Sequence, residues 1–153
     1  MDTARLWAAR STCSRLHVGC VVARDSRILV TGYNGAPAGM EHCNHDCTCG
    51  DPRPSKKHGE QAVSHRHGCN ALQPCMISVH AEANAVSFAA RYGMSLDGAI
   101  LYTTHTPCRP CSMLIVNAGI AAVVWDIDYL RDDGLQLLEA GKVGFGRYRP
   151  KSG

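Results

Sequence analysis

Hydrophobic residues recur along the chain with spacings that predict both helices and strands. Two apolar runs, His17–Ala23 and Arg27–Gly32, flank Asp25-Ser26, an arrangement typical of a β-hairpin. Gly93, Gly119 and Gly141 each follow a segment of helix-forming residues and are plausible helix ends. We therefore expect helices at Ala4–Arg15, Val79–Tyr92, Arg109–Ala118 and Asp132–Ala140, and further strands at Ala99–Thr104, Ile120–Trp125 and Val143–Tyr148.

The order of these segments predicts the fold class. A hairpin followed by alternating helices and strands implies an α/β layered sheet with both faces covered. The length of 153 residues suits one domain with a core of its own. We expect a single domain over residues 1–153.

Composition narrows the partners and the compartment. Hydrophobic residues make up 45% of the chain and charged residues 19%, both ordinary for a globular protein. A net charge of +3 suits an anionic small molecule and is low for a surface that holds long nucleic acid. Apolar stretches such as Gly119–Trp125 are too short to cross a membrane, and Met1–Arg5 lacks the start of a signal peptide. We expect a cytoplasmic protein without membrane or long nucleic-acid partners.

Cysteine is the unusual feature of the composition. There are nine cysteines and eight histidines, and an odd number cannot pair completely in disulfides. In a reducing compartment such a surplus favours metal binding, with disulfides as the alternative. Residues 41–79 form a Cys/His-rich insertion with little hydrophobic periodicity, and a loop of this length needs something other than a core to order it.

Two short motifs carry the sharpest chemical signal. His80-Ala81-Glu82 begins a predicted helix, and Pro107-Cys108-Arg109-Pro110-Cys111 enters another. Zinc accepts imidazole nitrogen and thiolate sulfur, and catalytic sites use three protein ligands plus water. Cysteines three apart face one side of a first helical turn, where the helix dipole favours thiolates. We expect His80, Cys108 and Cys111 to hold a catalytic zinc whose bound water is activated.

Glu82 has a different predicted role. It follows the histidine by two residues and is placed to take a proton from the zinc-bound water and deliver it to a ring nitrogen and leaving amine. Alone, a C-x-x-C pair could equally be a redox pair or half of a structural zinc site. H-x-E followed by P-C-x-x-C is the general signature of zinc nucleobase deaminases, in which the hydroxide attacks C4 of cytosine.

The chain resembles the cytidine deaminase superfamily, and within it the deoxycytidylate deaminases of bacteria and phages. The resemblance covers most of the chain. It is carried by Arg10-Ser11-Thr12-Cys13, Val18-Gly19, Gly32-Tyr33-Asn34-Gly35-Ala36-Pro37, Cys43, His80-Ala81-Glu82-Ala83-Asn84-Ala85, Leu101-Tyr102-Thr103-Thr104, Pro107-Cys108-Arg109-Pro110-Cys111 and Asn117-Ala118-Gly119-Ile120. It implies a three-layer α/β/α fold with a mixed five-stranded sheet, and hydrolysis of dCMP to dUMP and ammonia.

The resemblance also implies substrate contacts. Asn34 would hydrogen-bond the sugar, the backbone of Ala81 would read the pyrimidine carbonyl, and Tyr129, together with Arg131, would serve the phosphate. Tyr33 and Asn34 have an alternative role as turn residues, because Asn-Gly is a good turn pair.

Regulation is a further implication of the resemblance. Many members are hexamers activated by dCTP with Mg²⁺ and inhibited by dTTP. Tyr33, Gly35, Phe88 and Arg91 lie in segments that resemble regions used for effector binding or subunit contact.

Family members often hold a structural zinc as well. Cys13 and Cys43 match the first two positions, and we expect Cys69 and Cys75 to complete a zinc-stapled insertion. Cys47 and Cys49 are possible further ligands, and unligated surface thiols are the alternative. Two or more zinc ions per chain follow. Cys20 lies on a predicted strand and is expected in the core.

Two rival functions remain. One is a deaminase for another cytidine nucleoside or nucleotide, for a 5-substituted dCMP or for transfer-RNA adenosine, because the metal site does not choose the substrate. The other is a nucleic-acid-binding zinc module that uses Lys56, Lys57, Arg66 and His67. Basic residues are few there, aromatic stacking residues are absent from the insertion, and the intact Glu82 argues against a dead site.

Overall fold

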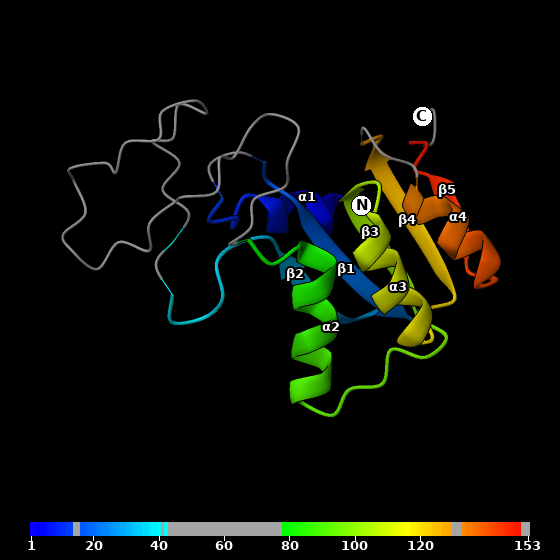
Figure 1. Ribbon diagram of the computed structural model, residues 1–153, viewed down its shortest axis with the longest axis horizontal. Helices are drawn as coiled ribbons and strands as arrows, with labels where there is room; N and C mark the ends of the chain where they lie inside the picture. Colours follow the sequence, from blue (N-terminus) through cyan, green and yellow to red (C-terminus); the bar gives the residue numbers. More distant parts are fainter. Residues whose placement is uncertain (14–15, 41, 43–77, 130–132, 151–153) are drawn as a thin grey trace.

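A computed structural model describes residues 1–13, 16–40, 42, 78–129 and 133–150 (Figure 1). Four helices and five strands lie in these ranges. They are α1 (Asp2–Ala8), β1 (Gly19–Arg24), β2 (Arg27–Tyr33), α2 (Ala81–Arg91), β3 (Ile100–His105), α3 (Arg109–Asn117), β4 (Ala122–Ile127), α4 (Asp133–Ala140) and β5 (Gly144–Arg147).

The five strands form one mixed sheet in the order β2-β1-β3-β4-β5. Strand β1 is antiparallel to β2 and to β3, whereas β3, β4 and β5 run parallel. This arrangement confirms the predicted mixed five-stranded α/β fold. Parallel strands end at the same edge of a sheet, and in such folds that edge is where ligands bind.

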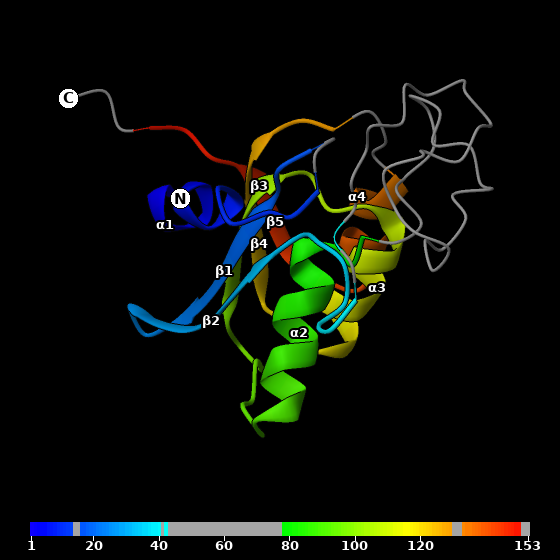
Figure 2. The same cartoon turned by 90° about the vertical axis from the view of Figure 1, so that its left-hand side faces the viewer.

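Helices cover both faces of the sheet. Figure 2 shows α1 on one face and α2 and α3 on the other, where α4 packs beside α3. Small side chains of α2 let that helix lie close to the sheet, and Ala81, Ala85 and Ala89 are all buried. The core that they share with the sheet includes Cys20, Val22, Val30, Leu101, Ile115, Val123 and Leu138. The core position expected for Cys20 is therefore observed.

The predicted hairpin is also observed. Asp25 and Ser26 link β1 to β2 with φ values of 52° and 61°. Two consecutive residues with positive φ make a type I′ turn, whose twist matches that of the flanking strands.

The first helix is shorter than predicted. It ends at Ala8 rather than at Arg15. The polar residues that follow bind another part of the chain, because the Thr12 N–H donates to the Asn34 carbonyl at 3.3 Å and the Ser11 hydroxyl donates to the Asn34 side chain at 2.7 Å. Tertiary hydrogen bonds of this kind outweigh weak helix propensity.

The observed starts of α2 and β4 also differ from the predicted ones, and in each case local backbone hydrogen bonds explain the difference. Val79 was expected in a helix, yet it forms an antiparallel bridge with Gly35, so α2 begins at Ala81. Ile120 was expected in a strand, but its N–H donates to the Ile115 carbonyl at 3.3 Å while Gly119 adopts φ 72°. These features are those of a Schellman cap, so Ile120 closes α3 and β4 starts at Ala122.

Most of the predicted insertion, residues 43–77, lies outside the described residues. Within the described ranges, no helix is long and apolar enough to cross a bilayer.

Gly32 sets how closely α2 approaches the sheet. A methyl group placed on it would overlap the carbonyl oxygen of Ala81 and lie 3.0 Å from the nitrogen of Ala85. Ala81 begins the helix that follows His80, so the glycine also fixes where that histidine lies.

We predict that Gly32→Ala lowers the free energy of unfolding by roughly 1–3 kcal/mol, because α2 must shift away from β2. The matched control is Gly146→Ala on β5, where an added methyl meets no atom within 4 Å. Urea denaturation of both variants measures the difference. Equal stability of the two variants would contradict this account of the packing.

Candidate active site

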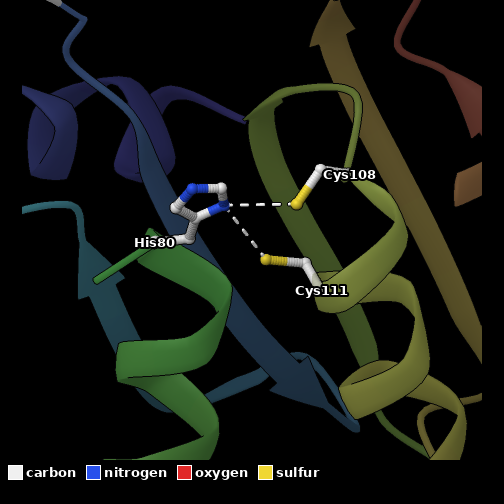
Figure 3. A group of neighbouring side chains, drawn as sticks. All are labelled: His80, Cys108 and Cys111. Carbon is white, nitrogen blue, oxygen red and sulfur yellow. Dashed lines mark hydrogen bonds between the residues drawn. The ribbon is translucent and has the colours of Figure 1, made fainter. Parts of the chain in front are cut away.

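Two helix N-termini bring three metal-binding side chains together. His80 is the N-cap of α2, Cys108 is the N-cap of α3, and Cys111 lies in the first turn of α3. The His80 Nδ1 atom lies 3.2 Å from the Cys108 sulfur and 3.4 Å from the Cys111 sulfur (Figure 3). His80 is separated from Cys108 by 28 positions and from Cys111 by 31 positions in the sequence, yet the three side chains converge on one point.

The donor set and its spacing fit zinc. With Zn–N near 2.0–2.1 Å and Zn–S near 2.3 Å, tetrahedral angles separate the nitrogen from each sulfur by about 3.6 Å. The observed separations of 3.2 and 3.4 Å need only a small expansion to admit the ion. Among the described residues, this is the one group of three or more potential ligands close enough to share a metal.

The ionisation of the two cysteine thiols is coupled, and this coupling also favours binding of a cation. Hydrogen bonding from Cys111, and then from His80, lowers the pKa of Cys108 to about 4. The same contact with Cys108 raises the pKa of Cys111, and burial raises it further. Cys108 is thus the thiolate of the pair. A divalent cation allows both sulfurs to ionise, because it offsets their mutual repulsion.

Glu82 lies beneath this group. Its side chain is 3% exposed, and its Oε2 accepts from the Cys111 thiol at 3.5 Å. The Thr103 hydroxyl on β3 donates to Oε1 at 3.4 Å. Burial is the largest influence on the Glu82 carboxyl and raises its pKa. A buried carboxyl with a raised pKa beside a metal site is suited to exchange protons near neutral pH.

A cavity of about 540 Å³ opens over these residues. It lies at the carboxyl ends of β3 and β4, between the N-termini of α2 and α3. Its size is that of a pocket for a small organic ligand. The residues that line it include His80, Glu82, Cys108, Cys111, Asn34, Ala81, His105, Thr106, Arg109, Tyr129 and Asp133.

Asn34 borders the cavity, but most of the hydrogen-bonding groups of its side chain are bonded to other parts of the protein. Its Oδ1 accepts from the Ser11 hydroxyl at 2.7 Å and from the Val18 N–H at 2.8 Å, and its Nδ2 donates to the Leu16 carbonyl at 2.7 Å. These bonds hold the segment after α1 in place. The second amide hydrogen has no acceptor among the described residues, so it is the part of Asn34 available to a ligand.

Tyr129 borders the cavity from the segment after β4. Its N–H donates to the Thr106 hydroxyl at 3.2 Å. Its neighbour Asp128 accepts from Trp125 Nε1 at 2.7 Å and from Arg147 at 2.9 Å. We call Trp125, Asp128 and Arg147 the Asp128 clamp. It ties the segment that carries Tyr129 to strands β4 and β5.

The remaining predicted site residues are dispersed. Ala81 is buried and lines the cavity. Tyr33 is half-buried and its carbonyl accepts from Asn84, while Gly35 pairs with Val79. Phe88 is exposed and packs on the exposed Tyr92, and Arg91 lies over the same ring. Cys13 is buried beside the cavity. Cys43, Cys47, Cys49, Cys69, Cys75 and Arg131 lie outside the described residues.

The threonines and the histidine at the end of β3 and directly after it have roles that the sequence did not predict. Thr103 contacts Glu82, Thr104 contacts His105, and Thr106 holds the backbone of Tyr129. Threonine is favoured in strands for its shape alone, so its hydroxyl gives little advance signal. Their adjacency to Pro107-Cys108 was the available hint.

Residues 1–127 match the family described as the cytidine and deoxycytidylate deaminase zinc-binding region. The chain belongs to this family. The His80, Cys108 and Cys111 cluster of this chain supports zinc as the metal of the domain.

Curated relatives of this deaminase domain agree with the family. It is 42% identical over 118 residues to a deoxycytidylate deaminase of Mycobacterium phage D29, covering 77% of this chain and 84% of the relative. It is 36% identical over 130 residues to ComE operon protein 2 of Bacillus subtilis, covering 84% of this chain. The chain spans 58% of the length of the Bacillus protein and 43% of a similar deoxycytidylate deaminase from Schizosaccharomyces pombe.

A solved structure shows the same fold. The dCMP deaminase of cyanophage S-TIM5, in complex with dCMP and dUMP, has a TM-score of 0.75 and 30% sequence identity. The match covers 96% of this chain and 92% of that one.

We predict that Cys108→Ser lowers bound zinc by about one equivalent per chain, because hydroxyl oxygen is a poor substitute for thiolate. The matched control is Cys20→Ala, a buried cysteine that is not part of the cluster and should leave zinc content unchanged. Elemental analysis of freshly purified protein measures both. Loss of zinc from Cys20→Ala with retention in Cys108→Ser would refute the assignment.

Proposed function

We propose that this protein hydrolyses dCMP to dUMP and ammonia. The observation that carries the proposal is the buried Glu82 carboxyl beside the zinc ligands, at the base of a cavity sized for a nucleotide. The named relatives and the cyanophage structure with dCMP and dUMP support this substrate class.

Different residues of the chain have different roles in the proposed reaction. Zinc bound by His80, Cys108 and Cys111 supplies Lewis acidity that activates water. Glu82 would take one proton from the attacking water and pass it to the ring nitrogen, and would then take the remaining proton of the added hydroxyl and pass it to the leaving amine. Thr103 holds Oε1, which leaves Oε2 to face the metal ligands. Burial, which raises the pKa of Glu82, makes the carboxylate a better proton acceptor.

Substrate contacts extend this proposal. The second amide hydrogen of Asn34 donates to the sugar, and the backbone of Ala81 reads the pyrimidine carbonyl. Tyr129 lies at the phosphate end, with Arg131 beside it in the chain. The cavity is then the nucleotide site.

We further propose a domain organisation with a structural zinc, and an effector-binding or subunit-contact surface. Residues 1–153 form one deaminase domain with an insertion at 41–79, and a structural zinc binds Cys13, Cys43, Cys69 and Cys75, with Cys47 and Cys49 as further candidates. Tyr33, Gly35, Phe88 and Arg91 serve effector binding or contact in a homo-hexamer. The effectors are dCTP with Mg²⁺ and dTTP.

We predict that Glu82→Gln lowers turnover by about 10²–10⁴-fold or more, because the amide cannot accept the proton. Zinc content should not change, since Glu82 is not one of the three clustered ligands. Steady-state kinetics with elemental analysis tests this, and Glu139→Gln on the exposed surface of α4 is the matched control. Activity retained in Glu82→Gln would refute the mechanism.

The substrate is tested with a panel of dCMP, CMP, 5-methyl-dCMP and deoxycytidine. We predict the highest kcat/KM for dCMP, because a nucleotide fills the cavity and meets its donors. The panel is repeated with dCTP and Mg²⁺, which should raise activity at low dCMP. A preference for deoxycytidine or a 5-substituted base would replace the proposed substrate, and unchanged hyperbolic kinetics would remove the proposed effector.

A further inference from the structure

His105 is a half-buried histidine that the proposed chemistry leaves unassigned. It ends β3, three residues before Cys108, and lines the same cavity as the zinc ligands. The ring of Tyr129 meets it edge-on, with centroids 6.5 Å apart and planes at 85°. A polar ring held in the wall of a ligand cavity is placed to contact the ligand.

A short chain of hydrogen bonds fixes which nitrogen of His105 carries the proton. The Gly19 N–H donates to the Thr104 hydroxyl oxygen at 3.2 Å. The same oxygen lies 2.9 Å from His105 Nδ1. The hydroxyl has a single hydrogen and no other acceptor among the described residues, so that hydrogen points at Nδ1, which then accepts.

The imidazole is therefore neutral, with its hydrogen on Nε2. Burial lowers the pKa of His105, and the nearby Asp126 carboxylate opposes this only in part. The neutral tautomer with Nε2–H is a hydrogen-bond donor at that atom.

The cavity that His105 lines holds one arginine, together with the carboxylates of Glu82 and Asp133. Arg109 lines the cavity at the start of α3, and of the described lining residues it is the one with a permanent positive charge. Glu82 and the zinc ligands occupy the part of the cavity where the base must react. The acceptor-rich group left for His105 and Arg109 is the phosphate of a nucleotide.

We propose that His105 Nε2–H donates a hydrogen bond to the 5′-phosphate of the bound nucleotide and so selects nucleoside monophosphates over nucleosides. This inference rests on the proposed deamination of dCMP. In this proposal His105 determines specificity, and the hydrogen bond from Thr104 keeps its proton on Nε2. Arg109 contributes the positive charge that attracts the phosphate.

Product inhibition tests the contact. His105→Phe keeps a planar ring and removes the donor, so the inhibition constant of dUMP should rise by about tenfold while that of deoxyuridine stays within about twofold. His105→Gln, whose amide nitrogen can occupy the place of Nε2, should keep most of the dUMP affinity. Equal weakening of dUMP and deoxyuridine, or equal loss in both variants, would overturn the inference.

Nuclear magnetic resonance of ¹⁵N-histidine-labelled, zinc-loaded protein gives a second readout. His105 should show the Nε2–H tautomer, its proton should shift when dUMP is added, and deoxyuridine should leave it unmoved. Thr104→Ser should keep the tautomer and Thr104→Val should lose it. An Nδ1–H tautomer of His105, or a proton signal that does not shift when dUMP is added, would overturn the inference. This test remains decisive if deoxyuridine binds too weakly for its inhibition constant to be measured.

Failure of the proposed function can be distinguished from failure of the proposed role of His105. If the wild-type protein does not turn over dCMP, the substrate assignment is wrong. If it does, and His105→Phe discriminates dUMP from deoxyuridine as well as the wild type does, only the role of His105 is wrong.

Discussion

Convergence of two helix N-termini on one point is the constraint that orders the rest of this structure. His80 and Cys108 cap different helices, yet their ligand atoms lie 3.2 Å apart. Such closeness requires α2 to press on β2 at Gly32 and α3 to begin directly after β3. The small side chains along α2 and the parallel run of β3, β4 and β5 follow from the same requirement.

The electrostatics of the site work as a unit. Two sulfurs and a carboxylate within hydrogen-bonding distance would repel one another if all were ionised in a buried site. A divalent cation relieves that repulsion, and the positive ends of two helices add to the effect. Thr103 keeps Glu82 directed at the site. The clustered thiols and the Glu82 carboxyl thus belong to one charge balance.

The clustering of His80, Cys108 and Cys111 was predictable from sequence because they come from two compact motifs at helix starts, where spacing determines direction. The sheet was predictable because its strands are short apolar runs between glycines and turns. The end of α1 at Ala8 was not, since the competing partner, Asn34, lies more than twenty positions away. The relay from Gly19 through Thr104 to His105 was hidden for the same reason: it links residues 85 positions apart.

The Asp128 clamp and the metal-binding cluster lie in different parts of the fold. Asp128 accepts from Arg147 on β5 and precedes Tyr129 in the chain. His80, Glu82, Cys108 and Cys111 lie on α2 and α3 or cap them. Substitutions in the last strand can therefore reshape one wall of the cavity while the metal-binding cluster stays intact.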